Sequence, residues 1–315
     1  MEQKTICVLG GGIGGVVAAN LIKKGLDNSG RVILIDKNPD HIFAPSFLWI
    51  VDGKREPEQI KRPLKRLERK GIEFVQGEIA KIDPADNSIL VGDQTIKYDY
   101  LVVALGAESN MGAIDNLDDA AINFYSLDGI LRLKKELQEF KGEDVVVLIP
   151  SSPYKCPAAP YEAAFLIDSK LRAMNKRAKT NISICTVEGL PMPGAGPEVG
   201  QMIKGLLSDR GIDFKPTLEV DSIDPKLKTI TFKGGERQQA DLLITVPPHK
   251  SPDVVKEAGL TNEAGWIPVD KKTLETKFRN IFAVGDITAI KLEGRYKPEK
   301  QLMVPKAGVF AHAEA

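Results

Sequence analysis

The feature that most constrains the fold is a glycine-rich turn near the N-terminus, in the stretch KTICVLGGGIGG at residues 4–15. Thr5–Leu9 is a continuous apolar run, typical of a strand buried on both faces of a parallel sheet. The pattern G-x-G-x-x-G follows at Gly10, Gly12 and Gly15, and the next residues have helical spacing. The first turn of a helix offers unpaired backbone N–H groups and a positive dipole end, so this turn suits a pyrophosphate.

A second strand and an acidic residue accompany the turn. Residues 31–35 (RVILI) predict a strand, and Asp36 stands at its end, 21 positions after Gly15. A carboxylate there can accept hydrogen bonds from an adenosine ribose. A glycine-rich loop of an unrelated α/β domain would not require this whole order of elements, so we predict a dinucleotide-binding domain.

Composition excludes several classes of protein. The length of 315 residues suits about two domains. Because 43 basic residues balance 43 acidic ones, no net field attracts nucleic acid or an anionic membrane. The first strand begins too close to Met1 for a signal peptide, and no apolar run reaches the roughly 18 residues of a membrane span. We therefore expect a cytoplasmic protein.

The three cysteines, Cys7, Cys156 and Cys185, form neither a disulfide framework nor a zinc-ligand spacing. We expect no metal site. Cys7 and Cys185 stand in apolar strand patterns, where a cysteine is usually a small buried hydrophobe.

Two stretches after Asp36 are less regular. Residues 38–53 read as a loop with three aromatic residues, which suggest either a local core plug or one wall of a pocket for a flat ligand. His41 in this loop is expected to be a surface residue rather than a metal ligand. Residues 56–70 have a basic, helical pattern, and residues 78–97 read as short antiparallel strands.

Two later strands end in turns that suit a ligand. Residues 100–104 (YLVVA) are apolar and stop just before Gly106, and residues 280–288 (NIFAVGDIT) bring Gly285 and Asp286 to a strand's carboxyl end. Parallel sheets bind ligands at that edge. An Asp at this position could instead cap a helix, but the presence of the glycine-rich turn at residues 10–15 favours a role in ligand binding. We predict a discontinuous domain of residues 1–110 and 265–315.

Residues 111–264 form a second α/β unit in this interpretation. The segments 144–149, 158–176 and 181–187 alternate strand, helix and strand, which predicts a second parallel sheet. After Ile149, however, prolines occupy the place of a second glycine fingerprint. Since proline has no N–H group and its ring blocks close approach, this turn is poorly suited to the phosphates of NADH.

The proline-rich turn carries Cys156 beside Lys155, just before a helix whose first turn is expected to contain Pro157. A positive neighbour and a helix N-terminus both favour the thiolate, so Cys156 is the candidate nucleophile.

Four segments carry a resemblance to a known family: SPYKCPAAPYE, FAPSFLWIVDG, VPPHKSPDVVKEAGL and VPKAGVFA. They resemble segments of sulfide:quinone oxidoreductases and of the flavin subunit of flavocytochrome c sulfide dehydrogenase. The resemblance covers essentially the whole chain. It implies an α/β fold with two Rossmann-like dinucleotide-binding domains, glutathione-reductase-like, and FAD as cofactor.

The resemblance also implies a reaction. Sulfide would be oxidised to persulfide or polysulfide sulfur on Cys156, and its electrons would pass through the flavin to a quinone. Glu162 matches a carboxylate that could manage protons, although a solvated helix residue is an equal alternative. Lys306 resembles a residue next to the isoalloxazine ring, where its charge would stabilise reduced flavin.

The residues that the resemblance implies for FAD are Gly10, Gly12, Gly14, Gly15, Asp36, Lys37, Pro45, Ile79, Ala104, Gly106, Gly285, Asp286 and Lys306. Some family members bond FAD covalently through an upstream cysteine. Phe124 or Tyr125 stands at that place here, so we expect non-covalent FAD. His249 and His312 are expected to be structural or solvated residues.

The chain departs from the family in lacking a second redox cysteine after VPKAG, and it lacks the tail that docks relatives on the inner face of the membrane. We expect a shortened form of such a protein, and the resemblance is compatible with a homo-oligomer. Two alternatives stay open: the flavin subunit of a cytochrome-linked sulfide dehydrogenase, and a flavoprotein that holds FAD or sulfur without turning over. Rapid reduction by NADH would instead indicate a type II NADH dehydrogenase.

Overall fold

A computed structural model describes residues 3–26, 29–297 and 300–315. The chain forms two compact units. Unit 1 comprises Met1–Ile42, Lys61–Glu108 and Lys250–Ala315, and unit 2 comprises Phe43–Ile60 and Ser109–His249. These bounds differ from the predicted ones in three places, the smallest being Ser109 and Asn110, which belong to unit 2. Residues 43–60 belong to unit 2 because their helix packs on a helix of that unit, and residues 250–264 belong to unit 1.

Unit 1 is built on a parallel sheet of order β21-β9-β1-β2-β5. Its strands are β1 (Lys4–Leu9), β2 (Gly30–Asp36), β5 (Ile72–Gln76), β9 (Tyr100–Val103) and β21 (Ile281–Ala283). Alternate residues enter two different cores: Leu9 and Ile33 pack on one face of the sheet, and Val8 and Leu34 pack on the other. Both faces are buried, which explains the continuous apolar runs of the sequence.

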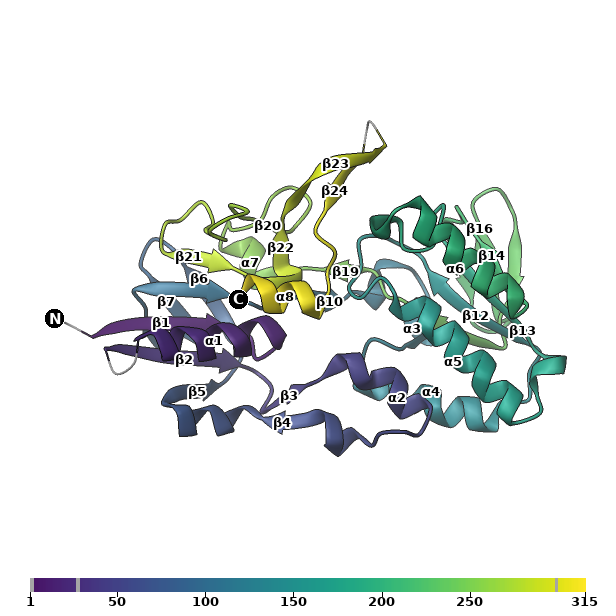
Figure 1. Ribbon diagram of the computed structural model, residues 1–315, viewed down its shortest axis with the longest axis horizontal. Coiled ribbons are helices and arrows are strands. Elements are labelled where there is room, and N and C mark those ends of the chain that lie inside the picture. Colours follow the sequence, from purple (N-terminus) through teal and green to yellow (C-terminus); the bar gives the residue numbers. More distant parts are fainter. Residues whose placement is uncertain (1–2, 27–28, 298–299) are drawn as a thin grey trace. The chain divides into compact units, whose positions relative to one another are not determined.

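Helices and an antiparallel sheet cover these faces. Helix α1 (Ile13–Leu26) lies along β1 and β2, and α8 (Gly308–Glu314) packs beside α1 (Figure 1). The predicted antiparallel meander is present as β6 (Ile79–Asp83), β7 (Ser88–Val91) and β8 (Gln94–Lys97), with α7 (Asp253–Glu257) packed beside β6.

The remaining elements of unit 1 are short. They are β3 (Asp40–Ile42), β4 (Lys61–Pro63), η3 (Leu64–Lys70), β20 (Ile267–Pro268), η7 (Gly285–Ile287), β22 (Thr288–Ala289), β23 (Lys291–Lys297) and β24 (Lys300–Met303). The predicted helix over residues 56–70 is therefore wrong: a strand lies between two 3₁₀ segments. Pro63 would stand in the interior of such a helix, where it removes a backbone hydrogen bond and its ring clashes with the preceding turn.

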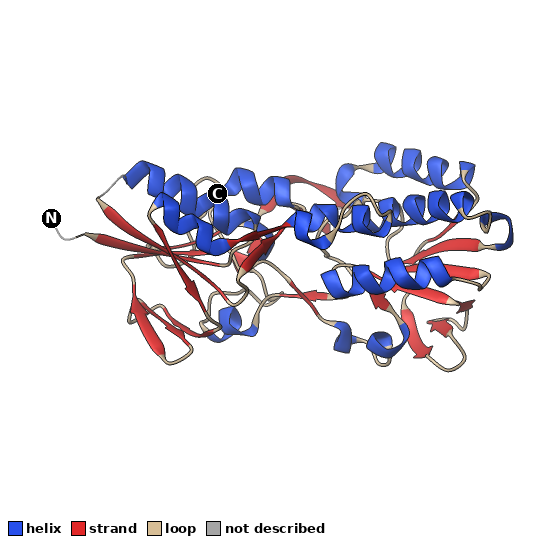
Figure 2. Ribbon diagram, turned by 90° about the horizontal axis from the view of Figure 1, so that it is seen from below, coloured by secondary structure: helices blue, strands red, loops and turns tan. Residues whose placement is uncertain are grey.

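Unit 2 is built on the second predicted parallel sheet, of order β11-β18-β12-β13-β14. Its strands are β11 (Ile122–Asn123), β12 (Asp144–Ile149), β13 (Asn181–Thr186), β14 (Ile212–Lys215) and β18 (Leu242–Thr245). Its α-helices are α2 (Phe47–Val51), α3 (Leu117–Ala120), α4 (Leu127–Glu139), α5 (Ala159–Ala173) and α6 (Pro197–Asp209). Figure 2 shows helices (blue) lying over strands (red) in both units.

A three-stranded antiparallel sheet that the sequence did not predict completes unit 2. It consists of β15 (Val220–Asp224), β16 (Thr229–Phe232) and β17 (Arg237–Gln239), and it packs Ile230 and Phe232 against Val146 and Cys185 of the parallel sheet. The short elements of unit 2 are η1 (Ala44–Ser46), η2 (Pro57–Ile60), η4 (Met111–Ala113), η5 (Arg177–Lys179) and η6 (Pro193–Ala195). The chain crosses between the units within β10 (Glu108–Ser109) and β19 (His249–Lys250).

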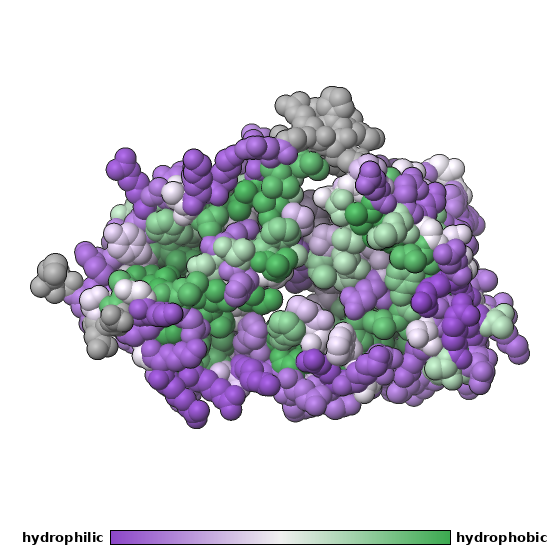
Figure 3. All heavy atoms as spheres, viewed as in Figure 1, coloured by the Kyte–Doolittle hydropathy of each residue, from purple (hydrophilic) through white to green (hydrophobic). Residues whose placement is uncertain are grey.

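The predicted α/β fold with two Rossmann-like units is confirmed. Within the described part of the chain, every helix is too short or too polar to cross a bilayer. Apolar residues (green) gather on the face of unit 1 over α1 and α8 (Figure 3). Helix α8 contributes Val309 and Phe310, whose exposed fractions are 71% and 39%.

Candidate functional site

The glycine-rich turn between β1 and α1 has two positions where only glycine fits. Gly10 has a φ of +102°, and a Cβ there would lie 2.4 Å from the carbonyl oxygen of Ala104. A Cβ on Gly15 would lie 1.9 Å from the carbonyl oxygen of Gly10. Gly12 differs, because a Cβ there would meet no atom within 4 Å. The space beside Gly12 is therefore open to the phosphates of a ligand.

Asp36 supports the turn directly. Its Oδ2 accepts a hydrogen bond from the Gly11 N–H at 2.6 Å, and its Oδ1 accepts one from the Asn38 N–H at 2.7 Å. A carboxylate has about four lone-pair sites, so Asp36 can still accept a ribose hydroxyl. His41 lies in strand β3 rather than in a free loop, with Nδ1 2.8 Å from the Gly11 carbonyl oxygen. His41 and Asp36 together hold the backbone of Gly11 on both sides.

The other predicted cofactor residues fall at different places. Ala104 follows β9 and donates its N–H to the Leu9 carbonyl at 2.8 Å. Gly106 has a φ of +67°, and a Cβ there would meet open space. Lys37 is exposed and forms a long ion pair, 3.9 Å, with Glu108.

Gly14, Ile79 and Pro45 complete the predicted set. Gly14 lies inside α1, and Ile79 is the first residue of β6. Pro45 belongs to unit 2, so it is not in the unit that carries the other predicted FAD residues. The aromatic residues around it also divide: Phe47 is buried, and Trp49 is exposed with the Arg55 guanidinium 4.9 Å from its ring centroid.

A second backbone turn faces α8. Gly285 has a φ of +79° and donates its N–H to Oε2 of Glu314 at 2.6 Å. Burial raises the pKa of the Glu314 carboxyl. The carbonyl of Asp286 accepts a hydrogen bond from Nζ of Lys306 at 2.5 Å, and the carbonyl of Thr288 accepts a longer one at 3.3 Å.

Lys306 is a buried cation. Its exposed fraction is 8%, and its Nζ lies 3.5 Å from the centroid of the Trp266 ring. Burial lowers the pKa of Lys306 to about 8, although the nearby charges of Asp286 and Glu314 act in the opposite direction. No local sequence signal marks Trp266, because its contact with Lys306 joins segments that are far apart in the chain.

Cys156 lies in unit 2, in the proline-rich turn between β12 and α5. Its side chain is exposed, and its backbone has a φ of +52°. The carbonyl of Cys156 accepts hydrogen bonds from the Ala159 N–H at 3.0 Å and the Tyr125 hydroxyl at 3.2 Å. Pro160, rather than the predicted Pro157, stands in the first turn of α5, since the helix begins at Ala159.

The other two cysteines are fully buried, as predicted. Burial raises the pKa of the Cys7 thiol to about 12 and that of Cys185 to about 11. Such thiols are protonated at neutral pH and poor nucleophiles. Glu162, in the first turn of α5, is exposed, although the protein around its carboxyl raises its pKa.

A buried carboxylate that the sequence analysis missed lies beneath the Cys156 turn. Glu188 follows β13, the position of the ribose-binding acid in a Rossmann domain. Glu188 is 7% exposed, and its carboxylate accepts hydrogen bonds from the hydroxyls of Tyr154 at 3.1 Å and Tyr161 at 2.5 Å. Two tyrosine hydroxyls thus already occupy hydrogen-bonding positions of this carboxylate.

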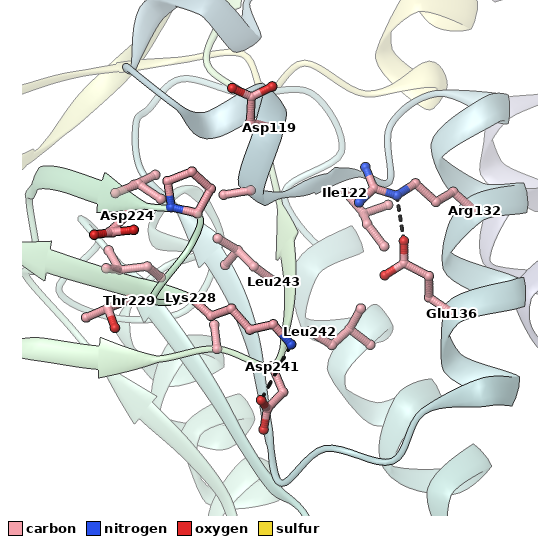
Figure 4. A pocket seen from close by; sticks show the side chains of 15 residues that line it. Asp119, Ile122, Arg132, Glu136, Asp224, Lys228, Thr229, Asp241, Leu242 and Leu243 are labelled. Atoms are coloured by element: carbon pink, nitrogen blue, oxygen red, sulfur yellow. Dashed lines mark hydrogen bonds and ion pairs between the residues drawn. The ribbon is translucent and has the colours of Figure 1, made fainter.

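A cavity of about 230 Å³ also lies in unit 2, between α4 and strands β15, β16 and β18 (Figure 4). Four of its charged side chains form two ion pairs: Arg132 with Glu136 at 2.6 Å, and Lys228 with Asp241 at 3.8 Å. None of the predicted site residues lines it. Among the described residues, no three or more His, Cys, Asp or Glu side chains form a group that could hold a metal ion.

Comparison with known proteins places this geometry in a class. Residues 4–309 match the family model described as pyridine nucleotide-disulphide oxidoreductase, and the chain belongs to that family. Its curated relatives include the mitochondrial sulfide:quinone oxidoreductase of Mus musculus, 27% identical over 90% of this chain, and the sulfide-quinone reductase of Aquifex aeolicus, 28% identical over 91%. The resemblance to sulfide:quinone oxidoreductases is therefore confirmed.

A solved structure supports the same assignment. The X-ray structure of the sulfide:quinone oxidoreductase from Aquifex aeolicus has a TM-score of 0.87 to this chain, with 27% identity, over 99% of this chain and 75% of that one. The chain spans 65% of the length of the mouse relative and 69% of the Aquifex relative. The family to which the chain belongs is one of oxidoreductases, and the open Gly12 turn with Asp36 fits the dinucleotide part of FAD.

Proposed function

We propose that this chain oxidises sulfide, with Cys156 carrying the sulfur, FAD bound non-covalently and a quinone as electron acceptor. One observation carries the proposal: Cys156 is an exposed thiol in the turn that replaces a second glycine fingerprint, while Cys7 and Cys185 are fully buried. The names of the mouse and Aquifex relatives support sulfide and quinone as substrates.

The same turn argues against NADH as the electron donor. Four prolines, at positions 150, 153, 157 and 160, remove backbone N–H groups that a pyrophosphate would need. Glu188, at the place of the ribose-binding acid, already accepts hydrogen bonds from Tyr154 and Tyr161. A nicotinamide nucleotide would have to break these buried contacts to bind there.

The chemistry assigned to Cys156 needs a thiolate. Lys155 and the N-terminus of the 15-residue helix α5 both favour the charged form. In the proposed step the Cys156 thiolate and hydrosulfide form an S–S bond. The S–H bond of hydrosulfide breaks with release of one proton, two electrons leave, and the product is the Cys156 persulfide anion. FAD, when bound, would supply the two-electron acceptor, and a quinone is the proposed final acceptor. Glu162, whose pKa is raised, is the proposed acceptor of the proton.

Unit 1 supplies the residues that would hold FAD. The open backbone at Gly12 and the start of α1 would bind the pyrophosphate, and Asp36 would bind the ribose. Lys306 would place a positive charge beside the flavin ring.

We propose activity at the inner face of the membrane, because quinones dissolve in the bilayer. The exposed Val309 and Phe310 suit contact with such a surface.

The test is an anaerobic flavin titration followed by absorbance. We expect sulfide to bleach the flavin and NADH to leave it oxidised, and C156S to lose the response to sulfide. C185A is the matched control, because that thiol is buried, and it should bleach as the wild type does. Bleaching by NADH, or equal bleaching of C156S by sulfide, would contradict the proposal.

The acceptor is tested by adding an oxidant to the sulfide-reduced protein. A short-chain quinone should restore the oxidised spectrum under anaerobic conditions. Reoxidation by a c-type cytochrome but not by the quinone would favour the cytochrome-linked sulfide dehydrogenase. No reoxidation by either would leave a flavoprotein that performs only the first half of the reaction.

A further inference from the structure

Lys306 is expensive to bury. An ammonium group removed from water needs compensating contacts, or it gives up its proton. The structure supplies two carbonyl oxygens, from Asp286 at 2.5 Å and Thr288 at 3.3 Å, and the face of the Trp266 ring. The ring centroid lies 3.5 Å from Nζ, well within the range of a cation–π contact.

Strand pairing places the backbone of Trp266 close to Lys306. Strand β20 pairs in parallel with β22, and Ile267 is the partner of Thr288, whose carbonyl accepts a hydrogen bond from Lys306. Trp266 is the residue immediately before Ile267. Asn262 fixes the backbone of Trp266 with two hydrogen bonds. Its Oδ1 accepts one from the Trp266 N–H at 3.1 Å, and its own N–H donates one to the Trp266 carbonyl at 2.8 Å.

Trp266 is itself buried, with an exposed fraction of 7%. Tryptophan gives the strongest cation–π contact of the aromatic residues, and the contact strengthens when water is excluded. The charged groups that face Lys306 are those of Asp286, from η7, and Glu314, from α8, and both favour the ammonium form. The ring and these two carboxyl groups therefore oppose the effect of burial.

We propose that Trp266 is a positioning residue, which keeps the Lys306 ammonium charged and fixed against the Asp286 carbonyl and thereby raises the reduction potential of the bound flavin. The inference rests on the part of the proposed function that binds FAD in unit 1 beside Lys306. It does not depend on sulfide or quinone as substrates.

The coupling between the two side chains has a direct readout. The chain has two tryptophans, Trp49 and Trp266, so W49F leaves Trp266 as the sole source of indole fluorescence. We expect its fluorescence lifetime to titrate with a midpoint near pH 8, and this titration to vanish in W49F/K306M. W49F/K271M is the matched control, because Lys271 is an exposed lysine of the same unit. A titration that persists without Lys306 would overturn the coupling.

The effect on the flavin is measured by the midpoint potential of the FAD-bound protein between about pH 6 and pH 8. W266L should lower the potential relative to wild type, and the gap should widen with pH as Lys306 loses its proton. At about pH 8 we expect a tenfold change in the reduction equilibrium, which is about 30 mV for a two-electron couple. W266F, which keeps a weaker ring face, should lie between the two.

Each outcome decides the inference. A gap that is the same at every pH, or no gap in either variant, would contradict the assigned role, since a merely structural residue would not change the pH dependence. If W266L fails to fold, W266F and the fluorescence titration still test the proposal. Failure of sulfide to bleach the flavin would overturn the proposed function and leave these two measurements unaffected.

Discussion

At the scale of single residues, the two site residues with the clearest physical signatures lie in different units. Cys156 has an exposed side chain on a backbone held by the Tyr125 hydroxyl and the Ala159 N–H. Lys306 is buried and has its pKa lowered to about 8 for that reason. Thiol exposure favours chemistry with a soluble substrate, whereas a desolvated cation suits electrostatic stabilisation of a bound group.

The lowered pKa of Lys306 predicts a pH dependence of stability. The folded chain releases this proton near pH 8, whereas the unfolded chain keeps it to about pH 10.5. Between these values the unfolded state binds more protons, so the contribution of Lys306 to the free energy of unfolding rises with pH. In total the rise is about 3 kcal/mol.

K306M should lack this rise. The measurement is urea unfolding of wild type and K306M at several pH values, with K271M as a control that should follow wild type. A difference between wild type and K306M that stays constant from pH 8 to pH 10 would contradict the assigned pKa.

At the scale of elements, the turn between β1 and α1 separates two roles of glycine. Gly15 is required by the fold, since a Cβ there would lie 1.9 Å from the Gly10 carbonyl oxygen. Gly12 has no atom within 4 Å of such a Cβ, so the fold itself tolerates a side chain. Only a bound ligand would meet it.

The two alanine variants should therefore behave differently. G15A should lower the free energy of unfolding of the FAD-free chain by about 2 kcal/mol through overpacking. G12A should change it by less than about 0.5 kcal/mol but weaken FAD binding about tenfold. Thermal unfolding and FAD titration measure both effects. Equal FAD affinity of G12A and wild type would show that the phosphates do not bind at this turn.

The sequence predicted the regular elements for local reasons. Buried parallel strands are continuous apolar runs, so β1, β2, β9 and β12 could be located from these runs in the sequence alone. The polar stretch that forms β15–β17 lacked such a signal, and its sheet depends on packing against Val146 and Leu148. The apolar spacing of residues 56–70 predicted a helix wrongly, because the effect of the interior proline on backbone hydrogen bonding outweighs that spacing.

Parts of the candidate site were predictable because their signal is local. The glycines, Asp36 and Cys156 lie in short motifs with a known chemistry. The hydrogen bonds from Tyr154 and Tyr161 to Glu188 join residues 34 and 27 positions apart, and no sequence motif marks them. The same holds for the ring of Trp266 over Lys306 and for His41 against Gly11, which only tertiary packing brings together.

At the scale of the whole molecule, the two units divide the proposed work. Unit 1 has a glycine-rich turn, an acid and a buried cation that suit FAD. Unit 2 has the same kind of sheet, but prolines occupy the turn where a nicotinamide nucleotide would bind, and the carboxylate of Glu188 accepts hydrogen bonds from two tyrosines. The same turn carries the exposed thiol of Cys156. In the proposed function, the second dinucleotide-binding fold therefore presents a cysteine instead of binding a nucleotide.

The central claim is that sulfur from sulfide becomes bonded to Cys156. The direct measurement is to add sulfide anaerobically, trap thiols and persulfides with an alkylating reagent, and analyse the peptides by mass spectrometry. We predict one or more additional sulfur atoms on the peptide that contains Cys156 and none on the peptides of Cys7 and Cys185. Bleached flavin together with an unmodified Cys156 peptide would contradict the account.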